Sequence, residues 1–241
     1  MRIPDDSFLK TLPIAHRGLH NAKKGIPENS CAAFENARLC GYAAETDVRF
    51  TKDGKLVAFH DDDLERMTGE RAKVIDRTYA ELCKLRLDGT SEKIPLFSEL
   101  LELIDGKIPL LIEIKNQPER KDTVQETLRT LSGYRGEFAL QTFHPLYLLQ
   151  IKRLSPHILR GQLGTFMPNF SPQNYVVKNM SLNFLTSPDF ISYNIENLPF
   201  PKARRKDTLL LAWTVRDHET LQKAQKHADN IIFEDVRPDL S

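Results

Sequence analysis

The sequence predicts a closed α/β barrel of eight parallel strands, on the strength of three observations. Its 241 residues are close to the roughly 250 that one such barrel needs. Short apolar runs alternate with stretches of helical periodicity, which is typical of βα units around a parallel sheet. No GxGxxG motif follows the first predicted strand, which disfavours an open dinucleotide-binding sheet. We therefore expect a single domain over residues 1–241.

Each predicted strand is a short apolar run next to a turn or a helical stretch. Between the first two strands, Ser30 can cap a helix that Gly41 ends. The turn at Asp53 and Gly54 predicts an additional antiparallel strand at residues 55–60. The eight predicted barrel strands are residues 13–16, 43–50, 108–115, 137–142, 158–162, 190–194, 209–215 and 230–234.

Two connections between the predicted strands are unusually long. Residues 61–107 exceed an ordinary βα loop, and helical spacing appears there at 79–85 and 96–104. We interpret 96–104 as a barrel helix and the charged segment 61–93 as a small insertion between barrel strands 2 and 3. After the fifth barrel strand, a long loop carries Phe166 and Phe184.

Composition excludes several classes of function. The 34 basic and 33 acidic residues leave a net charge of +1, which argues against binding nucleic acid or an anionic membrane surface. No signal peptide and no transmembrane segment is predicted from the chain. The three cysteines form no CxxC pair and are typical of free thiols in a reducing compartment. We expect a cytoplasmic protein.

Acidic residues gather where two neighbouring barrel strands end. Glu45 and Asp47 are two positions apart and therefore share one face of a strand, and Glu113 and Lys115 repeat this spacing on the next strand. Oxygen ligands of this kind suit a hard divalent cation such as Mg²⁺ or Ca²⁺. The alternative is a structural salt-bridge network closed by Lys115 and Arg17.

Two histidines and an arginine lie at the same strand ends. Because imidazole titrates near neutral pH, His16 and His60 could serve as a general acid and a general base. The planar fork of Arg17 matches a phosphate or a carboxylate. Trp213 either packs in the core or lines a substrate pocket.

These residues, in this order, resemble the glycerophosphodiester phosphodiesterase family. The match begins at IAHRG (14–18) and PENS (27–30) and continues through ETDVRFTKDGKLVAFHD (45–61). It extends through LIEIK (111–115) and reaches weaker signals at AWTVR (212–216) and IIFEDVRP (231–238). The combination of HRG, PENS, ExD and a later HD is specific.

The resemblance implies a TIM (β/α)8 barrel with a small insertion between strands 2 and 3. It also implies metal-dependent hydrolysis of a small-molecule glycerophosphodiester to sn-glycerol 3-phosphate and an alcohol, with Mg²⁺ or Ca²⁺ as cofactor and a cyclic phosphate as intermediate. By this match, His16 and His60 are the general acid and base, and Glu45, Asp47 and Glu113 are the metal ligands. The match also assigns substrate contacts to Arg17, Glu28, Lys115 and Trp213.

Other functions are compatible with parts of the pattern. A phospholipase-D-like activity on lysophospholipids is the main alternative, and the apolar loop around residues 166–170 is the feature that would support it. A Schiff-base aldolase could use Lys115, but it would leave HRG and the three carboxylates unexplained. A binding module without chemistry would be expected to lack a catalytic group, and none is missing.

Overall fold

The computed structural model describes residues 3–166, 172–200 and 208–240. Nine strands in these residues are hydrogen-bonded in the order β1-β9-β8-β7-β6-β5-β4-β2-β3, and β1 also pairs with β2. The eight strands other than β3 therefore form a closed ring, which confirms the predicted barrel. The strands are β1 (Ile14–Ala15), β2 (Ala43–Phe50), β3 (Leu56–Ala58), β4 (Leu110–Ile114), β5 (Phe138–Thr142), β6 (Arg160–Gly164), β7 (Phe190–Asn194), β8 (Leu209–Val215) and β9 (Asn230–Phe233).

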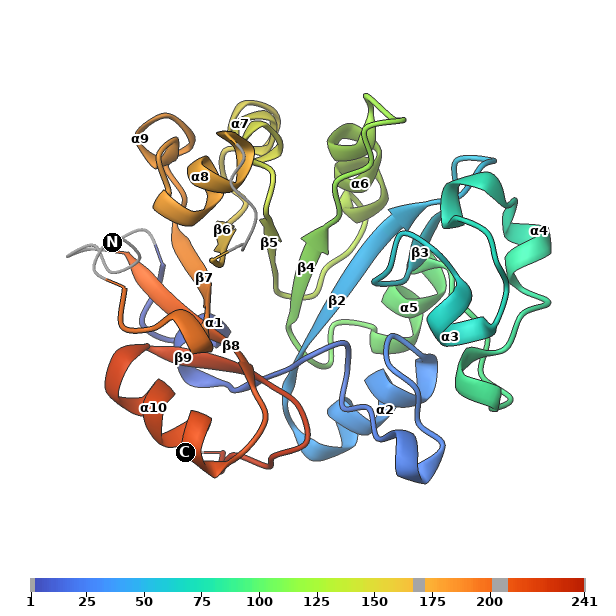
Figure 1. Ribbon diagram of the computed structural model, residues 1–241, viewed down its shortest axis with the longest axis horizontal. Helices are drawn as coiled ribbons and strands as arrows, with labels where there is room; N and C mark the ends of the chain where they lie inside the picture. Colours follow the sequence, from blue (N-terminus) through green and yellow to red (C-terminus); the bar gives the residue numbers. More distant parts are fainter. Residues whose placement is uncertain (1–2, 167–171, 201–207, 241) are drawn as a thin grey trace. The chain divides into compact units, whose positions relative to one another are not determined.

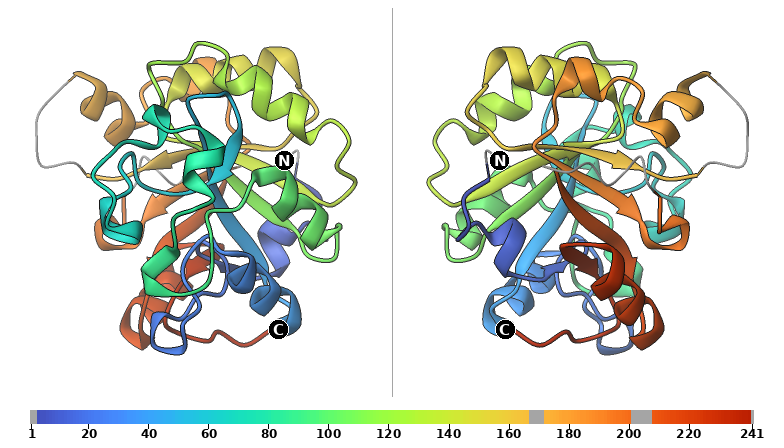
Figure 2. Two further views of the ribbon diagram at one scale, coloured as in Figure 1. Left: turned by 90° about the vertical axis from the view of Figure 1, so that its right-hand side faces the viewer. Right: turned by 90° about the vertical axis from the view of Figure 1, so that its left-hand side faces the viewer.

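The chain divides into two compact units, residues 15–137 and residues 1–14 with 138–241. In each unit, helices pack beside the strands (Figure 2). The first unit contains η1 (Ala22–Lys24), α2 (Cys31–Cys40), α3 (Glu65–Thr68), η2 (Val74–Asp76), α4 (Tyr79–Leu82), η3 (Leu87–Gly89), α5 (Phe97–Ile104) and α6 (Thr123–Leu131). The second contains α1 (Phe8–Thr11), α7 (Pro145–Leu154), α8 (Pro172–Asn179), α9 (Asn183–Thr186), η4 (Ile195–Asn197) and α10 (His218–His227).

In the unit of residues 15–137, β2 and β4 lie side by side as parallel strands (Figure 1). Their register places Asp47 opposite Glu113. β3 returns antiparallel to β2 through the turn at Gly54, whose φ of 74° favours glycine. All eight residues of β2 are buried, and their side chains alternate between the two faces of the strand.

The predicted insertion forms short helices around a small core of its own. α3, η2, α4 and η3 lie within residues 61–93. Apolar side chains of this segment pack with those of β3 and the residues around it, which ties the insertion to the strand beside the acidic residues. The buried members are Val57, Phe59, Leu64, Met67, Val74, Leu82, Leu87 and Ile94.

Several predicted boundaries differ from those observed. Strands 43–50, 190–194 and 209–215 are confirmed at both ends, whereas the fifth barrel strand occupies Arg160–Gly164 instead of 158–162. The loop predicted around Phe184 contains α8 and α9, and Phe184 lies in α9 with 77% of its surface exposed. An exposed apolar residue weakens the helical periodicity from which the sequence pattern is read. The prediction of a single domain stays a prediction.

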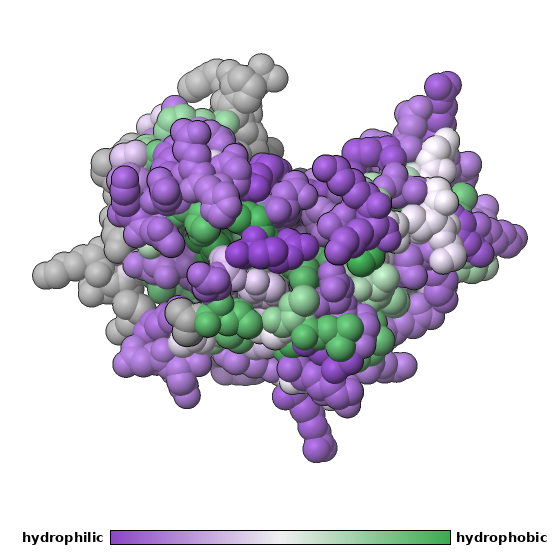
Figure 3. Space-filling model, turned by 90° about the horizontal axis from the view of Figure 1, so that it is seen from below, coloured by the Kyte–Doolittle hydropathy of each residue, from purple (hydrophilic) through white to green (hydrophobic). Residues whose placement is uncertain are grey.

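Among the described residues, no helix is both long enough and apolar enough to cross a membrane. On the face drawn in Figure 3, hydrophilic side chains predominate and hydrophobic ones form small clusters between them.

Candidate functional site

Three carboxylates meet inside the unit of residues 15–137. One oxygen from each of Glu45, Asp47 and Glu113 lies within 4.8 Å of the other two. Glu45 and Asp47 point to the same side because they are two positions apart on β2, and the parallel register brings Glu113 beside them from β4. All three are buried. They can therefore reach one ion.

The surroundings of these carboxylates are electrostatically unequal. Burial, and then repulsion from Asp47 and Glu113, raises the pKa of Glu45 well above its usual value. Burial also raises the pKa of Glu113 despite the attraction of Lys115. Burial opposes ionisation of Asp47 as well, but Lys115, His60 and Arg17 hold the pKa of that carboxyl well below its usual range. Ionisation is thus costly at Glu45 and Glu113 and favoured at Asp47.

Lys115 and Arg17 supply positive charge beside the three carboxylates. The Lys115 Nζ lies 2.8 Å from Asp47 Oδ1 and 2.8 Å from Glu113 Oε1, and Arg17 Nε lies 3.7 Å from Asp47 Oδ2. The ion pairs expected of a salt-bridge network are therefore present. Burial alone would lower the pKa of Lys115, but Asp47 and Glu113 outweigh burial and raise it. A protonated lysine argues against the Schiff-base alternative.

The donor set fits a hard divalent cation. Three buried carboxylates supply oxygen ligands, which Mg²⁺ and Ca²⁺ prefer. The raised pKa values of Glu45 and Glu113 show that negative charge is costly at this place, so an added positive charge would be favoured there.

The turn after β1 holds Arg17 against the carboxylates. The Arg17 backbone N–H donates to Glu45 Oε2 at 3.0 Å, and the Gly18 N–H donates to the Glu45 carbonyl at 3.1 Å. Gly18 has a φ of 75°, and a Cβ there would lie 2.9 Å from Ala33. The HRG turn therefore requires glycine at its third position.

Asn29 was not among the predicted site residues, yet it lies against Asp47. Its Nδ2 donates to Asp47 Oδ2 at 2.9 Å, and its Oδ1 accepts from Thr46 Oγ1 at 3.0 Å. Its backbone N–H donates to the Arg17 carbonyl at 2.9 Å. The PENS segment is therefore tied to the turn after β1 and to β2, and only the PENS motif itself could have pointed to this residue.

His60 follows β3 and is held by its neighbours. Its Nδ1 lies 2.6 Å from Asp61 Oδ1, and its carbonyl accepts from Arg49 Nε at 2.9 Å. Burial lowers the pKa of His60 to about 4, although Asp47 attracts the charged form. The ring is therefore neutral near pH 7 and able to accept a proton.

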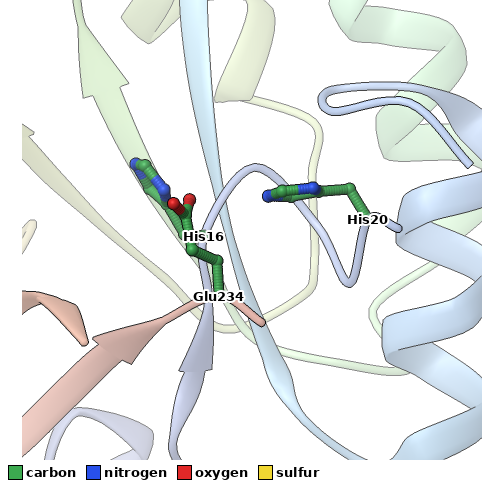
Figure 4. A group of neighbouring side chains, drawn as sticks. All are labelled: His16, His20 and Glu234. Atoms are coloured by element: carbon green, nitrogen blue, oxygen red, sulfur yellow. The ribbon is translucent and has the colours of Figure 1, made fainter. Parts of the chain in front are cut away.

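His16 lies on the segment after β1, as predicted. Figure 4 shows the His20 ring pointing towards the His16 ring, and one nitrogen of each lies within 4.8 Å of the other. His16, Arg17, Glu28 and His60 all belong to the same unit as the carboxylate cluster. The Glu28 Oε1 accepts from Arg17 Nη1 at 2.8 Å, so Glu28 is bound to the arginine of the HRG turn.

Trp213 belongs to the other unit, on β8. Its Nε1 donates to the Ser192 carbonyl at 3.0 Å, and its ring meets Phe143 edge-on with centroids 5.8 Å apart. The ring is half-buried. Its predicted place in a substrate pocket stays a prediction.

Known proteins match this chain over most of its length. The glycerophosphoryl diester phosphodiesterase family matches this chain over residues 16–236. A glycerophosphodiester phosphodiesterase of Caldanaerobacter subterraneus subsp. tengcongensis is 36% identical over 94% of this chain and 95% of its own length.

Solved structures resemble the fold over nearly the whole chain. A phosphodiesterase of Oleispira antarctica, in complex with the product sn-glycerol-3-phosphate, has a TM-score of 0.79 and 24% identity, covering 93% of each chain. A glycerophosphodiester phosphodiesterase of Parabacteroides distasonis has a TM-score of 0.76 and 25% identity, covering 94% of this chain and 93% of its own.

Proposed function

The chain belongs to the glycerophosphoryl diester phosphodiesterase family, and we propose that it hydrolyses glycerophosphodiesters to sn-glycerol 3-phosphate and an alcohol. The observation that carries the proposal is the buried group of Glu45, Asp47 and Glu113 beside Lys115 and Arg17. Carboxylates for a cation and basic groups for phosphate together suit a phosphodiester, whose reacting centre is anionic.

The metal ligands of this proposal are the three carboxylates. A divalent cation, Mg²⁺ or Ca²⁺, held by Glu45, Asp47 and Glu113 would lower the pKa of the glycerol hydroxyl and offset charge on the phosphate. Arg17 and Lys115 bind phosphoryl oxygens, with Lys115 also fixing the carboxylates. Glu28 belongs to the rim of the site, and Trp213 forms a wall against the glycerol group.

His16 and His60 move the protons. One histidine accepts the proton of the glycerol hydroxyl, whose oxygen then forms a bond to phosphorus. The bond between phosphorus and the alcohol oxygen breaks, and the other histidine protonates that oxygen. A cyclic glycerol phosphate results, and water opens it with the two histidines exchanging roles. The neutral ring of His60 suits it to accept a proton.

A substrate panel tests the proposal. After chelation, Ca²⁺, Mg²⁺ and Mn²⁺ are added back separately, and release of glycerol 3-phosphate is measured from several glycerophosphodiesters. We expect release that depends on added cation. Release that is unchanged by chelation would remove the metal from the scheme.

Single substitutions test the histidines. His16→Ala and His60→Ala should each lower kcat by about 100- to 10,000-fold, because general acid and base catalysis contributes about that much. His157→Ala, at an exposed histidine, is the matched control and should keep normal turnover. Circular dichroism checks that each variant folds. A near-normal rate in either site variant would reject the two-histidine scheme.

Two finer predictions remain. The lysophospholipid alternative rests on the apolar loop, of which residues 167–171 lie outside the described residues, and a lysophospholipid in the panel tests it. Cytoplasmic residence rests on the three cysteines, which are free.

A further inference from the structure

An arginine of the insertion, Arg66 on α3, is connected to His60 through one carboxylate. Arg66 Nε donates to Asp61 Oδ2 at 2.6 Å, and Asp61 Oδ1 lies 2.6 Å from His60 Nδ1. Each oxygen of Asp61 is thus used by a different partner. The sequence pattern does not predict this contact, because Arg66 appears there only as one of several charges in the insertion.

The hydrogen bond to Asp61 selects a tautomer of His60. Burial would raise the pKa of Asp61, but hydrogen bonds from Arg66 and His60 lower it to about 2. An ionised carboxylate only accepts hydrogen bonds, so His60 Nδ1 must carry the hydrogen. The other nitrogen, Nε2, then has a free lone pair, which is the form that can accept a proton.

Arg66 is itself held in place from the opposite side. Its Nη2 donates to Glu28 Oε1 at 2.6 Å, and its Nη1 donates to Glu28 Oε2 at 3.0 Å. The Glu28 Oε1 also accepts from Arg17. A planar guanidinium that binds two carboxylates at once has little freedom to turn, so Asp61 meets a fixed donor.

The backbone of His60 has a separate anchor. The guanidinium of Arg49, buried on β2, donates to the His60 carbonyl at 2.9 Å. With the carbonyl fixed from β2, the orientation of the ring depends on Asp61. Fixing Asp61 therefore fixes the ring.

We propose that Arg66 is a positioning residue that holds the His60 ring through Asp61 in the orientation and tautomer needed for proton transfer. This inference rests on the proposed acid–base function of His60. A lysine would serve less well, because one ammonium group cannot reproduce the planar fork on both carboxylates.

A double-mutant cycle on kcat tests whether Arg66 acts on His60 through Asp61. The probe substrate is sn-glycero-3-phosphocholine. Arg66→Met and Asp61→Ala should each lower kcat by about 10- to 100-fold, a range typical of residues that orient a reactive histidine. The double variant should match Asp61→Ala within about twofold, because Arg66 acts through Asp61. Arg66→Lys should recover part of the loss. Losses that multiply in the double variant would overturn the proposal.

A control and a second readout separate positioning from general damage. Arg71→Met removes an exposed arginine of the same insertion, which pairs with Glu65 at 2.9 Å, and should leave kcat within about twofold. The ¹⁵N resonances of the His60 ring, assigned by comparison with His60→Ala, report the tautomer directly. We expect hydrogen on Nδ1 in the wild type and in Arg71→Met, a weakened preference in Arg66→Met, and loss of the preference in Asp61→Ala.

The two readouts can fail independently. If the wild type does not hydrolyse the probe, the proposed function is in question, and the nitrogen resonances still test the positioning. An unchanged His60 tautomer in Arg66→Met would overturn the inference even in an active enzyme.

Discussion

Glu45 and Asp47 are two positions apart on β2, yet their surroundings shift the pKa values of the two carboxyls in opposite directions. Asp47 faces Lys115 and Arg17, whose positive charge outweighs burial and favours the ionised form. Burial, together with the negative charges of Asp47 and Glu113, raises the pKa of Glu45. Identical chemistry on one strand face thus gives one charged carboxyl and one that resists ionisation.

Asp61 makes the pH dependence of stability testable at a single side chain. Its pKa is about 2 in the folded protein against a usual 3.8, so between these pH values the unfolded chain binds more protons. Its contribution to stability is therefore present above about pH 4 and disappears as the pH falls towards 2. Because Asp61 is partly exposed, solvent screens its ion pairs and the full value of roughly 2 kcal/mol is not expected. Urea unfolding should show the difference in unfolding free energy between the wild type and Asp61→Asn falling by about 1 kcal/mol in that range.

The control for this measurement is Asp6→Asn, at an exposed position, which should follow the wild type throughout. A constant difference between wild type and Asp61→Asn from pH 5 to pH 2.5 would contradict the expectation.

Helix α2 shows how an element positions the site. Ser30 Oγ accepts from the Ala33 N–H at 3.1 Å and donates to the Pro27 carbonyl at 2.7 Å. The helix ends at Gly41, where φ is 75°. Because Asn29 precedes this cap, the start of α2 determines where Asn29 meets Asp47.

Removal of the cap should weaken this element measurably. Ser30→Ala should lower the free energy of unfolding by about 1–2 kcal/mol, because it removes the side-chain acceptor of the Ala33 N–H and the donor to the Pro27 carbonyl. Chemical denaturation measures this loss. Ser98→Ala, at an exposed position inside α5, should cost nothing. Equal stabilities for the two variants would show that the cap is dispensable.

At the scale of the whole chain, parallel pairing of β2 with β4 brings together carboxylates that are more than sixty positions apart in sequence. A cation bound by Glu45, Asp47 and Glu113 would link these strands in the folded state alone. Binding would therefore increase the stability of the entire protein.

The measurable consequence is stabilisation by added metal. Ca²⁺ or Mg²⁺ at about 100 times its dissociation constant should raise the free energy of unfolding by about 2.7 kcal/mol. Glu45→Gln keeps an acceptor for the Arg17 N–H but loses a charge, so it should lose most of this increase. His157→Ala should keep it. If metal stabilises the wild type and Glu45→Gln equally, the ion binds elsewhere.

Local sequence patterns predicted most of the fold. The hairpin after strand 43–50 follows from an Asp–Gly turn, and both the strand and the hairpin are confirmed. Helices α8 and α9 were missed because exposed Tyr175 and Phe184 obscure the amphipathic pattern. The closeness of Glu45 and Asp47 was predicted because a spacing of two is a local property of a strand. That of Glu113 was predicted because consecutive parallel strands of a barrel are neighbours.

The contacts of Asn29 and Arg66 could be known only once the chain had folded. Asn29 binds Asp47 across 18 positions, and Arg66 binds Glu28 across 38, with no periodicity that relates the partners. Alternation along a strand is set by the backbone and is present in any sequence that forms one. Contacts between distant loops depend on strand register, on helix caps and on side-chain packing, which exist only in the assembled tertiary structure.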